Sequence, residues 1–263
     1  MPTSSGGLPE LQPLVPQPDD VRAFTRERRA GVGEVGPSGR LRLDSIARWA
    51  QDVAWADVDD AGLRELTIWL VRRTRIRVRR FPQLDSAYAL TTYVTGVGRM
   101  WAERRTDIVA LDEREPIVEV ACIWVHIDPE RLLPSPIHRV ELDMWTGEST
   151  RPVKARLGHP APPGDVAERP WRFREAETDI ALHVNNAAYF TPFDEELLTA
   201  GAPVDDSTAV DIEIEYRTPA QAGPKRILRS GPMRWIASAG DGSPEVHASA
   251  ALAHWPDLPR LRV

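Results

Sequence analysis

Hydrophobic residues in the first half of the chain follow patterns that predict one helix and several strands. From residue 43 to residue 54 they recur at helical spacing behind the helix-start signal Asp44-Ser45, so we expect a helix ending near residue 57. Alternating hydrophobic and polar positions predict strands at 24–29, 69–80, 88–96, 101–112 and 117–127. Long strands without strand–helix alternation favour an α+β fold with an antiparallel sheet.

The second half repeats this order of elements. The pattern predicts a short strand, then a helix, then further strands, at 171–174, about 183–199, 210–217, 227–236 and 246–255. Ile76-Arg-Val78-Arg and Ile214-Glu-Tyr216-Arg each end a strand just before a proline-marked break. Although the two halves share little sequence identity, the repeated order predicts a duplicated unit in which a curved antiparallel sheet wraps a helix.

Proline-rich stretches divide the chain into four segments. Residues 1–20 are rich in Pro, Ser and Gly and resemble no signal peptide, so we expect a disordered leader. Residues 21–128 and 171–263 form the two folded units, joined by a linker at 129–170 that is draped over the surface. No apolar run approaches the roughly 20 residues of a membrane span. We therefore expect a cytoplasmic protein.

Composition limits the partners and the chemistry. A net charge of −6 argues against nucleic-acid binding, which requires a basic excess to neutralise phosphates. The single cysteine, Cys122, lies in a strand pattern and is expected to be a core residue, not a reactive thiol. Neither a phosphate-binding glycine loop nor a serine-hydrolase elbow is present in the sequence. No metal or other cofactor is expected, because five histidines show no ligand spacing: His126, His138, His159, His247 and His254.

An acid, a histidine and two asparagines precede the second predicted helix, at Asp179, His183, Asn185 and Asn186. Backbone N–H groups at a helix start are unpaired and partly positive, so those of Val184, Asn185 and Asn186 could hold an oxyanion. A carboxylate and an imidazole beside them could activate water. On the pattern alone, an Asx-type helix cap explains the segment equally well.

This segment resembles the D-x-x-x-H-V-N-N element of the acyl-ACP thioesterases, where ACP is acyl carrier protein. The first half resembles the same family in its W-x-V-R-R, R-x-P and G-R-M-W-A-E-R-R strings, at 69–73, 80–82 and 98–105. The resemblance extends over roughly residues 24–255. It implies a tandem (double) hot-dog fold and, in fatty acid biosynthesis, hydrolysis of fatty acyl-ACP to free fatty acid and ACP.

The resemblance also implies roles for individual residues. Asp179 and His183 fall on the family's catalytic aspartate and histidine, and Asn185 and Asn186 on its asparagine pair. Glu195 matches an acidic position in the central helix, although a solvated helix residue is an equal alternative.

Two positions depart from the family pattern. Asparagine is usual where this chain has Ala181, and glutamate is usual just after the strand end, where this chain has Pro219 and Ala220. Neither replacement can bond to water or carry a proton. A degenerate, weakly active or non-catalytic acyl-binding protein is therefore an alternative, as is an acyl-CoA thioesterase.

Arginines alternate along the strand at 69–80, and alternate residues share one face of a strand. Arg73, Arg75, Arg77 and Arg79 are thus candidates for docking acidic ACP, with a solvated outer sheet face as the alternative. Because the two halves can pair with each other, the chain is expected to be a monomer (a pseudo-dimer) or a homodimer.

The resemblance places the acyl-chain tunnel in the N-terminal half. Trp49, Trp55 and Trp69 lie there and could limit chain length, although core packing is the simpler role for each. Chain length and the choice between ACP and coenzyme A remain open.

Overall fold

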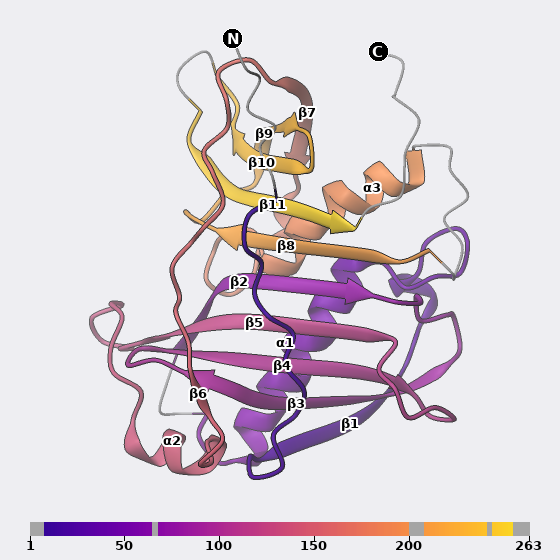
Figure 1. Ribbon diagram of the computed structural model, residues 1–263. Helices are drawn as coiled ribbons and strands as arrows, with labels where there is room; N and C mark the ends of the chain where they lie inside the picture. Colours follow the sequence, from indigo (N-terminus) through magenta and orange to yellow (C-terminus); the bar gives the residue numbers. More distant parts are fainter. Residues whose placement is uncertain (1–7, 65–67, 200–207, 241–243, 255–263) are drawn as a thin grey trace.

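The computed structural model of the chain describes residues 8–64, 68–199, 208–240 and 244–254 (Figure 1). Its strands are β1 (Ala23–Arg29), β2 (Ile68–Val78), β3 (Ala87–Val97), β4 (Trp101–Ala110), β5 (Val118–Ile127), β6 (Arg151–Pro152), β7 (Ala167–Phe173), β8 (Val210–Tyr216), β9 (Gly223–Ser230), β10 (Met233–Ser238) and β11 (Val246–His254). The helices are α1 (Leu43–Asp60), α2 (Arg139–Trp145) and α3 (Thr191–Thr199), with 3₁₀ turns η1 (Val32–Glu34), η2 (Glu175–Glu177) and η3 (Asn186–Phe190).

All of these strands belong to one sheet, which runs through both halves of the chain in the order β1-β3-β4-β5-β2-β8-β11-β10-β9-β7. Neighbours are antiparallel, except that the short β6 pairs in parallel with β3. The halves meet where β2 pairs with β8, and there Thr74 opposes Ile214 and Ile76 opposes Ile212. The predicted antiparallel α+β class is confirmed.

The largest hydrophobic core lies between this sheet and the helices. The long helix α1 crosses the inner face of the N-terminal strands, while α3 lies behind β8 and β11 (Figure 1). Ile46 and Trp49 from α1 share the core with Phe190, Phe193 and residues of both groups of strands. Each half is a helix wrapped by a curved antiparallel sheet, so the tandem hot-dog fold is confirmed.

A buried ion pair fastens the C-terminal helix to the N-terminal one. Both Nη atoms of Arg40 donate to Asp194 Oδ1 at 3.2 Å, and the backbone N–H of Leu43 donates to Asp194 Oδ2 at 2.6 Å. The carboxylate thus caps the start of α1 from the other half of the chain, where Arg42 offers no side-chain cap. Burial raises the pKa of Asp194 to about 6, and the Arg40 charge opposes that shift.

The segment expected to be a disordered leader is ordered in its described part. Residues 8–20 cross the outer face of the sheet (Figure 1), and Gln12 is only 2% exposed. Its backbone N–H donates to Glu213 Oε2 and its side-chain amide to Glu103 Oε2, both at 2.7 Å. The chain is held here because buried carboxylates on the sheet require hydrogen-bond donors. Residues 1–7 lie outside the described part.

The linker also crosses the outer face, and it contains more regular structure than predicted. It includes α2 and β6, and β7 begins within it at Ala167. The backbone N–H groups of Gly158 and His159 donate to the two oxygens of Glu215 at 2.6 and 3.0 Å. Among the residues described, no helix is long and apolar enough to cross a membrane.

Two predicted elements have different bounds in the structure. The single strand expected at 227–236 is a hairpin, β9 and β10, that reverses at Gly231, whose φ is 51°. Glycine adopts that left-handed conformation without steric cost. The helix expected from residue 183 starts only at Asn186, because 179–185 form a hydrogen-bonded loop.

The Asp194 contact predicts a difference between two adjacent acids of α3. Asp194→Ala should lower the free energy of unfolding by about 3–5 kcal/mol, because it leaves the Arg40 charge buried without a partner. Glu195→Ala, at an exposed position, should change it by less than about 0.5 kcal/mol. Urea denaturation of both variants measures the difference, and equal effects would contradict the capping role of Asp194.

Candidate active site

The loop before η3 brings Asp179 and His183 together. The Asp179 N–H donates to the His183 carbonyl at 3.0 Å, and the Leu182 N–H donates to the Asp179 carbonyl at 2.9 Å. Leu182 closes the loop with a φ of 60°, a left-handed conformation that is unusual for leucine. Thr178 and Val184 pair as an isolated bridge at its base. The sequence therefore forms a tight, internally bonded turn that fixes both side chains.

Asp179 is half-buried, and its own loop holds both carboxylate oxygens. Oδ1 accepts from the Ala181 N–H at 2.9 Å, and Oδ2 accepts from Asn185 Nδ2 at 3.3 Å. The same Oδ1 lies 3.8 Å from His183 Nδ1. At that distance the carboxylate can attract positive charge that develops on the imidazole during a reaction.

His183 lines a cleft, and its Nδ1 makes a contact within the loop. Its Nδ1 lies 3.2 Å from the Val184 carbonyl oxygen, which can only accept, so Nδ1 carries the proton in this contact. Nε2 is then the unprotonated nitrogen, available as a base. His183 is among the residues that line the cleft.

Of the three expected oxyanion donors, only Asn186 has a free N–H group. The Val184 N–H donates to the Ala220 carbonyl and the Asn185 N–H to the Glu177 carbonyl, both at 2.8 Å. That expectation was therefore wrong for these two residues, whose amides the fold uses internally. The Asn186 N–H has no acceptor within the described residues, and Asn186 lines the cleft. Asn185 has a supporting role, because its Oδ1 caps η3 at the Ala187 N–H, 2.9 Å away.

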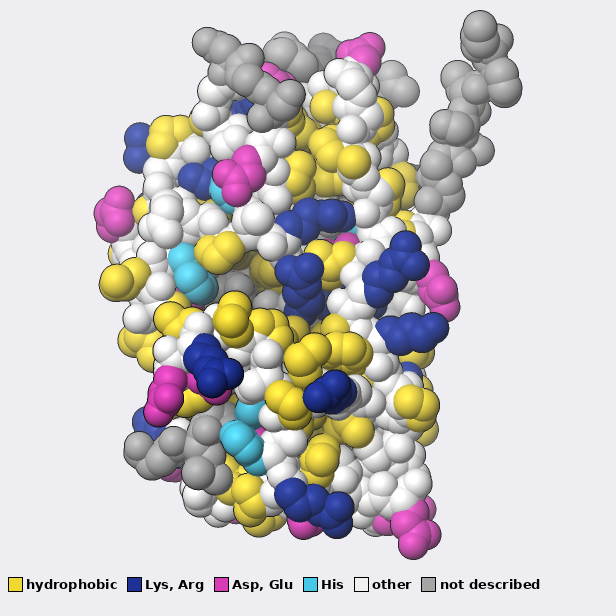
Figure 2. All heavy atoms as spheres, turned by 90° about the vertical axis from the view of Figure 1, so that its left-hand side faces the viewer, with side chains coloured by type: hydrophobic (Ala, Val, Ile, Leu, Met, Phe, Trp, Pro, Cys, Tyr) yellow, Lys and Arg dark blue, Asp and Glu magenta, His cyan; other side chains and the backbone are white. Residues whose placement is uncertain are grey.

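The cleft lies between the two halves, where β2 begins and β8 ends, and has a volume of about 530 Å³. The N-terminal half supplies a mainly apolar wall of Leu70, Val71, Arg72, Met100, Trp101, Val125, Ile127, Leu132 and Pro134. The C-terminal half supplies a mainly polar wall of His183, Asn186, Tyr189, Tyr216, Arg217, Thr218 and Pro219. On the face where β2 begins, hydrophobic side chains mix with Lys and Arg, and acidic groups lie mostly toward the margins (Figure 2).

Two tyrosines of the polar wall and one arginine of the opposite wall, which the sequence patterns did not single out, line the cleft. Tyr189 Oη accepts from the Ala220 N–H at 3.0 Å, and burial raises its pKa to about 12. Tyr216 Oη donates to the Asn186 carbonyl at 3.0 Å, which fixes the start of η3 against β8. Arg72 donates to the Tyr216 carbonyl at 3.1 Å across the seam. Inward-facing alternation could have revealed Tyr216, but it could not reveal its partner.

Comparison with known proteins shows which family the N-terminal half resembles. The model of the acyl-ACP thioesterase N-terminal domain matches residues 22–144. Residues 22–144 are therefore similar to the N-terminal domain of the acyl-ACP thioesterases. The match ends before the loop that carries Asp179 and His183, so it does not cover the C-terminal site residues.

Similar relatives and solved structures cover more of the chain than the family match does. Uncharacterized proteins from two strains of Mycobacterium tuberculosis are 26% identical over 219 residues, which is 82% of this chain and 85% of theirs. The structure of a candidate oleoyl thioesterase from Lactobacillus plantarum superimposes with a TM-score of 0.68 at 16% identity, covering 89% of this chain and 96% of that one. The 12:0-ACP thioesterase from Umbellularia californica gives 0.62 at 17% identity, covering 88% and 96%. These similarities show a shared fold.

The positions that depart from the thioesterase pattern contribute no acid to the cleft. Ala181 is exposed on the loop, Pro219 lines the cleft, and Ala220 contributes only its backbone groups. The ionisable groups among the lining residues are one imidazole, two guanidinium groups and two phenols, with no carboxylate. His183 is therefore the base that the described lining residues offer at neutral pH.

Glu195 lies away from the cleft, so the structure does not support its predicted catalytic role. Its side chain is exposed on α3, whereas the acids on either side of it are buried. Asp194 pairs with Arg40, and Glu196 accepts from Arg234 at 2.7 Å. The helix buries the paired acids and leaves Glu195 in solvent.

The predicted docking row is wrong for Arg73 and Arg75, which are 9% and 7% exposed. Arg73 lies 3.1 Å from Glu215, and Arg75 contacts both oxygens of Asp211 at 2.8 and 2.7 Å. The carbonyl groups of residues 156 and 12 cover these guanidinium groups from outside. Alternation correctly placed the arginines on the outer face, but that face lies beneath two crossing segments.

Arg77 and Arg79 are more exposed than the other two arginines of the row. Arg77 lies 3.0 Å from Asp211, and Arg79 lies 3.0 Å from Glu119. Both contact carboxylates that other arginines share, because Asp211 also pairs with Arg75 and Glu119 also pairs with Arg105.

Of the three tryptophans named as candidates in the N-terminal half, one lies in the core and two line a pocket. Trp49 is fully buried, and its indole N–H donates to Glu34 at 2.8 Å. Trp55 and Trp69 line a small pocket of about 90 Å³ between α1 and the sheet, together with Trp124 and Trp145. Two of the three tryptophans therefore line a pocket, and the third packs in the core.

The outer-face arginines predict unequal effects on stability. Arg73→Ala should lower the free energy of unfolding by about 3–5 kcal/mol, because it leaves Glu215 buried with one charged partner fewer. The matched control Arg79→Ala removes a half-exposed pair and should cost less than about 1 kcal/mol. Urea titration monitored by tryptophan fluorescence compares them. Equal midpoints would indicate that the pair at Arg73 is solvated.

Proposed function

We propose that the chain is a cytoplasmic thioesterase of fatty acid biosynthesis, which hydrolyses fatty acyl-ACP to free fatty acid and ACP. The observation that carries the proposal is the geometry of His183. Its Nδ1 contacts the Val184 carbonyl, so its Nε2 is available as a base at a cleft between the two hot-dog halves. The family of the N-terminal half and the relatives named as thioesterases support the reaction class.

The geometry supports a mechanism in which His183 acts directly and Asp179 acts through it. His183 Nε2 removes a proton from water as the water oxygen attacks the thioester carbonyl carbon. The Asn186 N–H donates to the oxyanion that forms, and Asp179, 3.8 Å from Nδ1, stabilises the imidazolium. When the carbon–sulfur bond breaks, the leaving thiolate takes the proton back from His183. A direct attack by Asp179 is less well supported, because both of its oxygens accept hydrogen bonds within the loop.

The two walls of the cleft suit the two ends of the substrate. The apolar wall of the N-terminal half can accept the start of an acyl chain, since burial of apolar surface is favourable. Arg72 and Arg217 lie on the cleft, and guanidinium groups suit the phosphate of a pantetheine arm. The exposed Arg99 lies beside the lining residue Met100, so we propose the mouth of the cleft as the ACP contact, in place of the arginine row.

Variants at His183 and Asp179 test the mechanism. His183→Ala should lower kcat for acyl-ACP about 10²–10⁴-fold, the range typical of a lost general base. Asp179→Asn should lower kcat by at least about tenfold, because the imidazolium that forms during the reaction loses its stabilising charge. The control Glu195→Ala should leave kcat unchanged. Unaltered turnover in His183→Ala would overturn the mechanism.

Retention of an acyl group without turnover is the second candidate, because Ala181 and Pro219 replace polar residues of the family pattern and no carboxylate is among the lining residues described. Purified protein should be assayed with matched acyl-ACP and acyl-CoA substrates at several chain lengths. We expect kcat/KM to favour acyl-ACP at least about tenfold and the preference to shrink with added salt, since salt screens exposed charges. Equal or reversed preference would favour the acyl-CoA alternative. Stoichiometric acyl binding without hydrolysis would favour the acyl-binding protein.

A further inference from the structure

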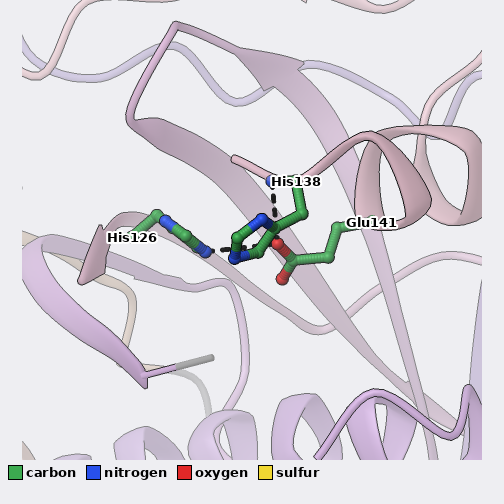
Figure 3. Close-up of side chains that lie close together, drawn as sticks. All are labelled: His126, His138 and Glu141. Atoms are coloured by element: carbon green, nitrogen blue, oxygen red, sulfur yellow. Dashed lines mark hydrogen bonds and ion pairs between the residues drawn. The ribbon is translucent and has the colours of Figure 1, made fainter. Parts of the chain in front are cut away.

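Two histidines and a glutamate meet beside the small tryptophan pocket, away from the proposed catalytic loop. His126 lies near the end of β5, and the chain then loops back so that His138 and Glu141 approach it from the start of α2 (Figure 3). One nitrogen of each imidazole and one carboxylate oxygen all lie within 4.8 Å of one another. His126 and Glu141 are fully buried, whereas His138 is exposed.

The buried acid has an oxygen without a partner. Glu141 Oε2 accepts from the backbone N–H of His138 at 3.1 Å, but Oε1 has no hydrogen-bond partner among the described residues. His126 Nε2, which is also buried, makes no hydrogen bond there either. Burying a carboxylate oxygen and a ring nitrogen without hydrogen bonds is costly, so a further group that contacts both would stabilise the cluster.

The other nitrogen of His126 indicates what that group is. Nδ1 lies 3.0 Å from the Ser135 carbonyl oxygen and 2.8 Å from Ser135 Oγ, and a contact to a carbonyl needs the proton on Nδ1. In that neutral tautomer the Nε2 lone pair faces Glu141 Oε2 at 3.2 Å, and two electron-rich atoms oppose each other. A cation between them removes this repulsion. A carbonyl that holds the second nitrogen is also the usual arrangement behind a metal-bound histidine.

We propose that His126, His138 and Glu141 bind a divalent transition-metal ion of the zinc type. Two imidazoles and a carboxylate suit zinc, whereas magnesium and calcium prefer oxygen ligands alone. Ligands about 2.0–2.1 Å from a tetrahedral zinc lie about 3.3 Å apart. The 3.2 Å between His126 Nε2 and Glu141 Oε2 matches one edge of that tetrahedron. The exposed His138 marks the side from which the ion enters, and water can take the fourth position.

Such an ion would clamp α2 onto the sheet. Trp145, the last residue of α2, and Trp69, whose ring lies 5.1 Å from that of His126, both line the small pocket. The metal would therefore hold two walls of this pocket in place without touching the catalytic loop. Sequence spacing gave no signal, because residues 126 and 138 come together only through the path of the linker.

Metal titration of the full chain, purified without a histidine tag and stripped with chelator, tests the site. Calorimetry should show one Zn²⁺ bound per chain, Co²⁺ should give a visible absorption band at the same stoichiometry, and Mg²⁺ should show no binding. Added Zn²⁺ should raise the Tm of the stripped protein, because a ligand that binds only the folded state stabilises it. Absence of saturable Zn²⁺ binding at this stoichiometry would overturn the proposal.

Three variants identify the ligands. His138→Ala and Glu141→Gln should each weaken Zn²⁺ binding at least about tenfold and remove the rise in Tm. His254→Ala, an exposed histidine on β11, is the matched control and should leave both unchanged. Because His138 is exposed, its variant should fold even if Glu141→Gln does not. Wild-type affinity in His138→Ala would place the ion elsewhere and refute the site.

Discussion

The pairing of β2 with β8 is the constraint on which the rest of the molecule depends. It joins two sheets into one, and its inner side merges two hydrophobic cores. On its outer side, Arg73 and Arg75 pair with carboxylates of β8. These buried charges need such pairing, because an unpaired charge is costly in apolar surroundings. The last paired residues are Arg73 and Glu215. The cleft opens directly beyond them, where the pairing stops.

The charged outer face explains why the chain crosses the sheet twice. Buried carboxylates need donors, and the backbone N–H groups of residues 12, 158 and 159 supply them. Gln12 reaches both Glu213 of β8 and Glu103 of β4, so the N-terminal segment ties strands of both halves together. What resembles a surface exposed to solvent is an interior layer between sheet and covering segments.

Hydrophobic alternation was enough to predict most strands, the helix α1 and the duplicated order, because side-chain period follows directly from backbone geometry. It could not predict what covers a face, so the arginine row and the order of residues 8–20 were misjudged. At the site, the motif located Asp179 and His183, yet the fold decides which amides stay free. Val184 and Asn185 donate to carbonyls that are distant or turned back in the loop, and no local pattern announces such partners. Helical spacing likewise could not predict that Glu195 is exposed while the acids on either side of it are buried.

The carboxylate of Asp194 has a consequence for how the two halves relate. It completes the first turn of α1 although it lies about 150 positions further along the chain, and its arginine partner precedes that helix. Without the C-terminal half, the start of α1 would lack its cap. Without the N-terminal half, Asp194 would lose its charged partner Arg40. The duplicated units have therefore lost their independence, and a chimera that exchanges one half with a relative must carry the acid and the arginine as a matched set.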